Sequence, residues 1–275
     1  MKIEDPMIPV PMPAQAPATD GFAHLPNGKL GYRDSGGTGA PVVFMHPAAS
    51  GDPLLWGYQQ PVFVAAGYRV ITYARRGYYK SDRLDPAHPG NAAEDLHHFL
   101  NALGLGKAHV ISSGAGGSVA ADHALSHPEQ VRTLTVSSNY AGVRSGYLYD
   151  AAQRVRVKQW NELPRWYREF SSSYIVANPD GLKYWMSLQE EATKAKGVEQ
   201  EGYNLITAES FGQLKVPMCL LTGDADSSTP PSLMRMLASH VPDVELKIVS
   251  ETGHSPYWER PDVFNAAMLD YLDRH

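Results

Sequence analysis

A stretch of small residues near the middle of the chain has the spacing of a site for nucleophilic catalysis. Residues 110–117 read Val-Ile-Ser-Ser-Gly-Ala-Gly-Gly and join an apolar run to a segment with helical character. Gly-x-nucleophile-x-Gly at such a junction is typical of a nucleophile elbow, a sharp strand-to-helix turn that exposes a reactive side chain. Only small residues fit around this turn, because the two backbones pass close together. The central position here is Gly114, so the turn is retained and the nucleophile is missing.

A glycine cannot form an acyl-enzyme, so covalent catalysis through position 114 is excluded for the sequence as written. Ser113 precedes the apex of the turn, and strand alternation directs its side chain away from the direction of the apex side chain. Three interpretations stay open. In the first, a histidine and an aspartate elsewhere in the chain activate water or take a proton from the substrate. In the second, the protein is a serine hydrolase whose nucleophile is Ser113, or whose serine at position 114 was replaced by engineering. In the third, the protein binds a ligand and catalyses no reaction.

The elements around this turn alternate between strands and helices, beginning with a hairpin of two strands at 22–25 and 30–34. The other predicted strands are apolar runs, at 41–45, 68–73, 109–111, 131–137, 216–222 and 245–249. The predicted helices between them cover 92–103, 118–125, 232–240 and 261–272. This alternation favours the α/β class, with a mostly parallel central sheet and helices on both faces.

The alternation stops at residues 141–208, where helical patterns rich in tyrosine and tryptophan replace buried strands. We expect this segment to be a helical cap on a core formed by residues 21–140 and 209–275. Residues 1–20 contain five prolines and no apolar h-region, which predicts an extended arm rather than a signal peptide. As a group, the cap aromatics make an apolar or aromatic substrate more plausible than a charged one.

The amino-acid composition limits which binding partners and which cellular compartment can be expected. A net charge of −5 without a basic run gives no reason to expect nucleic acid, and no apolar stretch is long enough for a membrane span. The single Cys219 excludes an internal disulfide and favours the cytoplasm. No cofactor or metal is expected, because no cluster of histidines and carboxylates appears and the turn at Gly114 lacks the lysine of a phosphate loop. The expected partner is a small-molecule substrate, and a homodimer is compatible with the sequence.

Four stretches, in this order along the chain, resemble motifs of the α/β-hydrolase fold superfamily with a helical cap. They are Phe44-Met45-His46-Pro47, Arg75-Arg76-Gly77-Tyr78-Tyr79-Lys80-Ser81-Asp82, Leu220-Leu221-Thr222-Gly223-Asp224-Ala225-Asp226 and Glu251-Thr252-Gly253-His254-Ser255. They resemble the oxyanion loop, the Arg-Gly-x-Gly-x-Ser motif, the strand and turn that carry the acid, and the histidine loop. The resemblance covers residue 22 to the C-terminus and implies the α/β-hydrolase fold.

The resemblance implies that His254 is the catalytic base and that Asp226 orients it and stabilises its charged form. Imidazole suits this task because its ordinary pKa lies near neutrality. Asp224 is the alternative acid, although an aspartate at this place is also typical of a turn residue that bonds its own backbone. The strand at 131–137 is followed by no carboxylate, which favours Asp226.

By the same resemblance, the backbone N–H groups of Ala48 and Ala115 form an oxyanion hole, and Pro47 removes only its own N–H. The remaining candidate pocket residues are His46, Ser113, Trp56, Tyr140, Trp160, Trp166 and Tyr174. We therefore expect an enzyme acting on a small, largely apolar ester, lactone or carbonyl compound, with a His254–Asp226 general base and no covalent serine. A lyase would use the same dyad.

Overall fold

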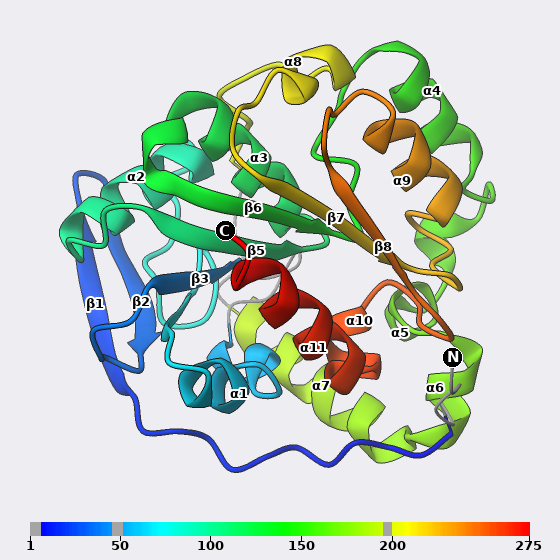
Figure 1. Cartoon of the computed structure of the whole chain (residues 1–275), viewed down its shortest axis with the longest axis horizontal. Coiled ribbons are helices and arrows are strands. Elements are labelled where there is room, and N and C mark those ends of the chain that lie inside the picture. Colours follow the sequence, from blue (N-terminus) through cyan, green and yellow to red (C-terminus); the bar gives the residue numbers. More distant parts are fainter. Residues whose placement is uncertain (1–6, 46–51, 195–199) are drawn as a thin grey trace.

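The computed structural model describes residues 7–45, 52–194 and 200–275 (Figure 1). In these ranges the centre of the molecule is one eight-stranded sheet in the order β1-β2-β4-β3-β5-β6-β7-β8. The strands are β1 (Thr19–Leu25), β2 (Gly28–Asp34), β3 (Pro41–Met45), β4 (Arg69–Tyr73), β5 (Ala108–Ser113), β6 (Val131–Ser137), β7 (Met218–Gly223) and β8 (Glu245–Val249). The hairpin strand β2 pairs antiparallel with β1 and β4, and the pairings from β4 to β8 are parallel. The prediction of a mostly parallel α/β sheet is confirmed.

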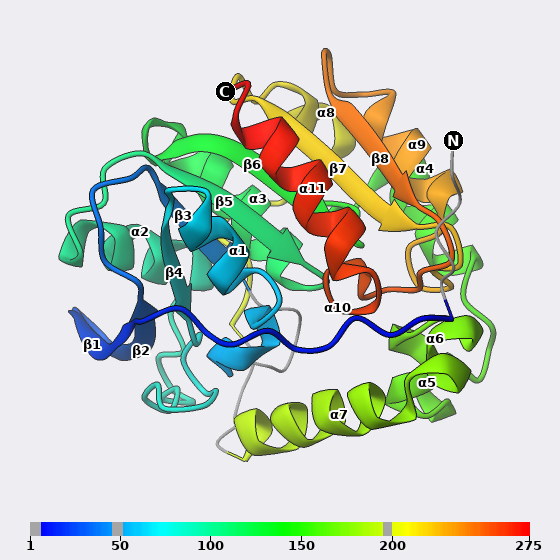
Figure 2. The ribbon, with the colours of Figure 1, turned by 60° about the horizontal axis from the view of Figure 1, so that its bottom comes forward.

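Helices cover both faces of the sheet (Figure 2), and strands β3, β4, β5 and β7 supply apolar side chains to both layers. One core lies under α2 (Ala92–Ala102), α3 (Gly116–Ser126) and α9 (Pro231–Ala238), and the other lies under α1 (Gln60–Ala65) and α11 (Pro261–Leu272). In β3, Val43 and Met45 enter the first core while Val42 and Phe44 enter the second. Successive side chains of a strand point to opposite faces, so a sheet covered on both sides needs a continuous apolar run.

Each predicted strand lies within three residues of its observed bounds. The apolar run predicts β5 only at 109–111, whereas the strand extends through Ser112 and Ser113. These serines pair with β6, and the Ser112 hydroxyl donates to the Thr135 carbonyl at 2.6 Å. A buried polar side chain is tolerated in a strand when its hydrogen bond is made within the sheet.

The described residues between β6 and β7 form helices joined by turns and irregular stretches. The helices are α4 (Gly146–Arg154), the 3₁₀ helix η3 (Trp160–Glu162), α5 (Arg165–Glu169), α6 (Ser172–Ala177), α7 (Pro179–Thr193) and α8 (Ala208–Gly212). Figure 2 shows α5, α6 and α7 lying together below α10 (Pro256–Glu259) and α11. Phe170, Tyr174 and Trp185 from this segment pack into the second core with Trp56 and Tyr257.

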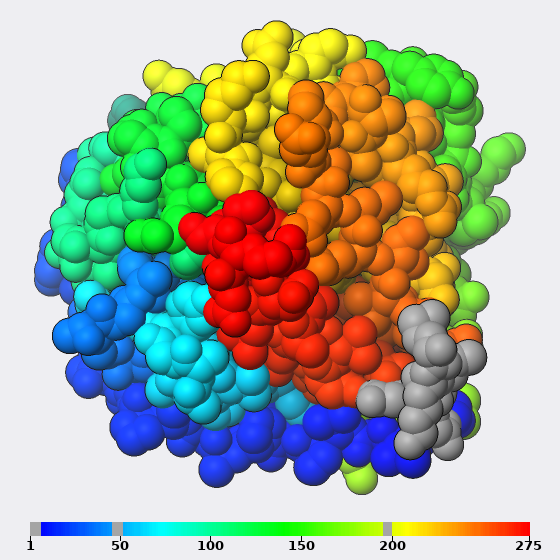
Figure 3. Space-filling view, viewed as in Figure 1, coloured from blue at the N-terminus to red at the C-terminus, as the bar shows by residue number. Residues whose placement is uncertain are grey.

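The arm begins to be described at residue 7 and runs in extended form along one edge of the molecule (Figure 3). Ala16 and Gln60 exchange two hydrogen bonds of 2.9 and 3.0 Å. Gln15 donates to the Gly57 carbonyl at 2.9 Å, beside the 3₁₀ helix η1 (Pro53–Trp56), and the Tyr58 hydroxyl donates to the Val10 carbonyl at 2.9 Å. The described part of the arm is therefore fixed to the core by specific polar contacts.

Candidate active site

The turn after β5 has the geometry of a nucleophile elbow. Gly114 has a φ of +51°, in the left-handed region that favours glycine, and α3 starts two residues later. Its N–H donates to the Ser137 carbonyl of β6 at 3.0 Å, which fixes the apex against the neighbouring strand. A Cβ at Gly117 would lie 2.8 Å from the Cβ of Asn139, so α3 can approach β6 closely only with glycine there.

Two loops at the same edge of the sheet bring His254 and Asp226 together. Asp226 follows β7 and His254 follows β8, and parallel strands end at a common edge. The imidazole Nδ1 lies 2.9 Å from Oδ2 and 3.1 Å from Oδ1 of the carboxylate. The dyad partners inferred from the resemblance are therefore in hydrogen-bond contact. Asp224 instead accepts from the Glu251 backbone N–H at 2.7 Å in an exposed turn.

The surroundings of Asp226 keep its carboxylate ionised. Burial alone would raise its pKa, but His254 and the N–H groups of Ser228 and Thr229, each 2.8 Å away, lower it. The Thr222 hydroxyl donates to Oδ2 at 3.1 Å. An ionised carboxylate only accepts, so Nδ1 of His254 must carry the proton in this contact.

The same contact sets the basicity of His254. Burial disfavours the imidazolium, yet the Asp226 carboxylate outweighs burial and raises the pKa of His254 to about 9. The side chain is 14% exposed. Because Nδ1 is held by Asp226, Nε2 is the nitrogen that remains to exchange a proton with a ligand.

A cavity of about 760 Å³ lies above the elbow and reaches His254. Gly114, Ala115, Tyr140 and Trp160 line it, so the structure brings these four predicted site residues together with the base. No described residue accepts a hydrogen bond from the Ala115 N–H. This N–H is the available donor at the position expected for half of an oxyanion hole. Two other predicted site residues, His46 and Ala48, lie outside the described residues.

Four predicted pocket residues lie elsewhere in the described structure. Trp56 and Tyr174 are buried in the second core, and Trp166 packs against that core. Ser113 is 1% exposed within β5, and its buried hydroxyl has no hydrogen-bond partner among the described residues. Large aromatic side chains gain most free energy by full burial, about 1.5–3 kcal/mol for a phenylalanine, which explains why these aromatics join a core.

Sequence reasoning missed several polar residues of the cavity wall. They include Ser138, Ser228, Thr229, Arg144, Arg156 and Arg168. Ser138 follows β6 with a φ of +52°, a strained conformation for a residue with a side chain. The arginines do leave a signal, because residues 154–168 hold four arginines among hydrophobic positions. No described serine hydroxyl is hydrogen-bonded to the ring of His254.

A buried carboxylate fixes the loop that carries the base. Glu259 accepts from the backbone N–H groups of Gly253 (2.9 Å), Ser255 (3.3 Å) and Ser171 (2.8 Å). Burial raises the pKa of Glu259 to about 7, although these N–H groups oppose the rise. The N–H of His254 itself donates to the Glu169 carbonyl at 2.9 Å. The histidine loop is thus tied directly to the helical segment between β6 and β7.

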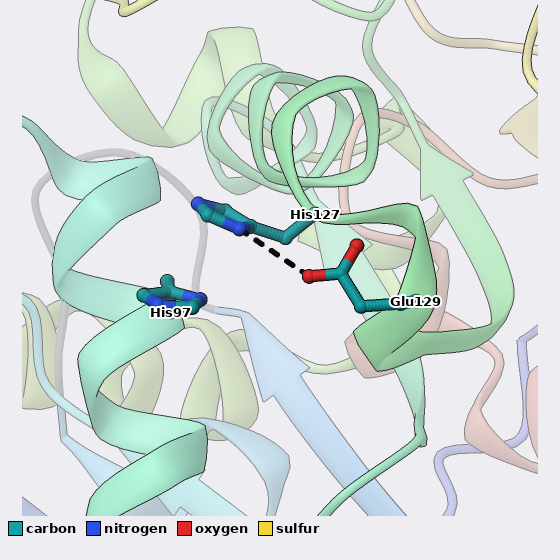
Figure 4. Close-up of side chains that lie close together, drawn as sticks. All are labelled: His97, His127 and Glu129. Atoms are coloured by element: carbon teal, nitrogen blue, oxygen red, sulfur yellow. Dashed lines mark ion pairs between the residues drawn. The ribbon is translucent and has the colours of Figure 1, made fainter.

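One cluster of potential metal ligands, His97, His127 and Glu129, lies away from this cavity (Figure 4). It is at the opposite edge of the sheet, because α3 runs back from the elbow and ends before His127. The ring nitrogens of His97 contact Gln130 and Asn101, and those of His127 contact Glu94 and Glu129. The two rings stack at 3.8 Å with an interplanar angle of 18°, so their lone pairs do not converge on one point. We assign this cluster a structural role.

Comparison with known proteins identifies the class of this chain. The model of the alpha/beta hydrolase family matches residues 42–267, so the chain belongs to that family. The fold and the motif-based family resemblance are therefore confirmed. No helix in the described ranges is long and apolar enough to cross a membrane.

The relatives and similar structures include proteins named as a hydrolase, a lactonase and an esterase. A 2-hydroxy-6-oxononadienedioate/2-hydroxy-6-oxononatrienedioate hydrolase of Dechloromonas aromatica is 27% identical over 93% of this chain and 96% of its own. An enol-lactonase from Burkholderia xenovorans has a TM-score of 0.71 at 20% identity, covering 92% of this chain and 100% of its own. An esterase from Thermogutta terrifontis has a TM-score of 0.70 at 22% identity, covering 94% and 99%. The prediction of a hydrolase-like enzyme is confirmed at this level.

Proposed function

We propose that this protein hydrolyses a small ester, lactone or carbon–carbon bond beside a carbonyl, with His254 as general base and without a covalent serine intermediate. The contact between His254 and Asp226 at the wall of the cavity carries this proposal. The similarity to a hydrolase named for 2-hydroxy-6-oxo dioates, to an enol-lactonase and to an esterase supports this range of substrates.

Each group has a defined task in this mechanism. Nε2 of His254 takes a proton from a water molecule whose oxygen attacks the carbonyl carbon. The Ala115 N–H stabilises the negative charge that forms on the carbonyl oxygen. The imidazolium then returns its proton to the leaving group as the second bond breaks. Asp226 holds the ring and stabilises its charge throughout.

The absence of a side chain at Gly114 leaves room for the attacking water in this mechanism. In the covalent mechanism a serine hydroxyl occupies the position above the elbow. With glycine, that position is open to a water molecule or to a substrate atom, directly beside Ala115. A lyase or other proton-transfer enzyme would use the same base and differ in its product, and a ligand-binding protein would use the cavity without the base.

The test uses the full chain with a panel of small 4-nitrophenyl esters and γ-lactones. His254→Ala should reduce turnover on the order of 10²–10⁴-fold, as expected for loss of a general base. His88→Ala is the matched control, because His88 also contacts an aspartate, Asp85 at 3.3 Å, but in an exposed loop. Equal turnover by the wild type and His254→Ala would remove His254 from the mechanism. Binding of these compounds without turnover would favour the binding protein.

A further inference from the structure

Three arginines and no acidic residue line the described wall of the cavity. Arg144, Arg156 and Arg168 contribute to it, in a chain whose net charge is −5. Such a concentration of one sign in a concave site raises the local concentration of ligands of the opposite sign. An excess of arginine is therefore a specific property of this cavity and not of the surface as a whole.

Arg156 and Arg168 converge on one aromatic ring. Their guanidinium carbons lie 5.8 and 6.0 Å from the centroid of the Trp160 ring, which itself lines the cavity. Contact of a guanidinium with an aromatic ring holds the charged group in place without neutralising it. Trp160 is thus a support that positions two cationic groups toward the same space.

Neither guanidinium has its charge balanced by an acid in the described part of the chain. The Nε atoms of Arg156 and Arg168 are buried and have no hydrogen-bond partner there. Two other arginines are paired: Arg165, on the same helix as Arg168, pairs with Glu169, and the buried Arg76 makes two bonds of 2.8 and 3.0 Å to Asp95. A buried, unpartnered donor on a charged group is costly, and a bound anion would satisfy it.

From this convergence we infer that Arg156 and Arg168 form a subsite for a carboxylate group of the substrate. The inference rests on the proposed function, because it names a substrate class for the same cavity. The planar fork of arginine matches the two oxygens of a carboxylate. The reacting part of the substrate lies at His254 and Ala115, and the carboxylate lies at Trp160. The expectation of a largely apolar compound is thereby refined to an apolar compound that carries one anionic end.

The geometry also couples the subsite to the base. The Asp226 carboxylate raises the pKa of His254 by more than burial lowers it. The positive charge of Arg156 opposes this effect and lowers the pKa of His254. A carboxylate bound at Arg156 would offset that charge. Substrate binding would then make His254 a stronger base in the complex than in the free enzyme.

The test is calorimetric titration of the full-length protein with benzoate and with benzamide, which have similar shapes and differ in charge. Benzoate should bind the wild type at least about tenfold more tightly than benzamide. Arg156→Gln and Arg168→Gln should each weaken benzoate binding about tenfold and leave benzamide unchanged. Arg154→Gln is the matched control, because Arg154 also lies over an aromatic ring, Tyr147 at 5.8 Å, but does not line the cavity.

Equal affinities for benzoate and benzamide would overturn the inference, as would an equal loss in Arg154→Gln. Inorganic phosphate should compete with benzoate only weakly. If phosphate binds the site more tightly than benzoate does, the subsite would be reassigned to phosphate esters. Arg156→Lys keeps the charge but loses the fork, so it should bind benzoate with intermediate affinity; thermal melts of each variant verify folding. His254→Ala should lose turnover but still bind benzoate more tightly than benzamide, so a failed subsite and a failed base are distinguished.

Discussion

The carboxylate of Asp226 holds His254 through Nδ1 at 2.9 Å and makes the imidazole an unusually strong base. Asp226 is buried and saturated by donors from its own turn, so its charge is fixed before any ligand arrives. An oriented base next to an elbow that lacks a nucleophile is the central feature of this site.

The pH dependence of turnover should report this base. His254 must be neutral to accept a proton, and its pKa is raised to about 9, so kcat/KM should rise from pH 7, reach half its maximum near pH 9 and level off only above it. Asp226→Asn removes the charge that raises the pKa, so the rising limb should move to a lower pH while the maximal rate falls. An unchanged limb in Asp226→Asn would assign the titration to another group.

The same pair gives stability a defined pH window. Because the folded pKa of His254 lies above its ordinary 6.5, its contribution is complete below about pH 6.5 and is lost as the pH rises through about 9. The pKa of Asp226 is lowered, so its contribution is present above 3.8 and is lost as the pH falls through the lower folded value. Urea unfolding from pH 8 to 10, above the raised pKa of Glu259, should show a decline for the wild type that is much smaller in His254→Ala.

Glu259 should matter to both stability and rate. Replacing it by alanine leaves three buried backbone N–H groups of the histidine loop and of Ser171 without an acceptor. Each costs about 1–3 kcal/mol, so the free energy of unfolding should fall by several kcal/mol. Glu259→Gln keeps one acceptor oxygen and should lose less stability, while its kcat falls because His254 is less well positioned. A kcat equal to that of the wild type in Glu259→Gln would show that the loop needs no such anchor.

Much of this fold was predictable because its strands, helices and turns are determined by residues that are close together in the sequence. The continuous apolar strands at Pro41–Met45 and Val131–Ser137, and the helix Pro261–Leu272, have the observed bounds. The elbow at Gly114 was predictable for the same reason, since a run of small residues between a strand and a helix is what close passage of the two backbones requires. The order of the motifs then indicated which aspartate lies beside His254.

The cavity wall was less predictable because it depends on packing between distant segments. An aromatic side chain in the cap sequence fits a core and a ligand site equally well: Trp160 faces the cavity, whereas Tyr174 and Trp185 join the second core. The roles of Arg156 and Arg168 require knowing that no acid lies beside them, which spacing along the chain does not reveal. Ser138 lies in the cavity wall because its backbone adopts a left-handed conformation, which a serine in the sequence does not predict.

The anchoring of the helical segment through its aromatic residues can be tested directly. Trp185 is fully buried, stacks edge-on with Phe170 at 5.0 Å and donates to the Tyr257 hydroxyl at 3.2 Å. Trp185→Ala should lower the free energy of unfolding by about 3–5 kcal/mol. The neighbouring Tyr184 is 39% exposed, and Tyr184→Ala should cost clearly less in the same urea titration. Equal losses would mean that this segment is not held by its buried tryptophan.

The vacant position above the elbow offers a gain-of-function test. Gly114→Ser places a hydroxyl where Ala115 and His254 line the same cavity. We expect new turnover of activated esters and stoichiometric labelling by fluorophosphonates, together with a slower native reaction because the hydroxyl fills the space that the proposed mechanism assigns to water. The φ of +51° makes the substitution strained, so thermal melts must accompany the assay. A folded Gly114→Ser protein with neither labelling nor new activity would show that the dyad is misaligned for acyl transfer.

The most direct measurement of the central claim is intact-mass spectrometry of the wild-type protein during turnover of 4-nitrophenyl acetate, with the release of nitrophenol followed in parallel. We expect steady turnover that depends on His254, without an initial burst and without a species heavier by one acetyl group. An acetyl adduct that maps to Ser112, Ser113 or Ser138 and accumulates in a burst would contradict direct attack by water and establish a covalent serine mechanism.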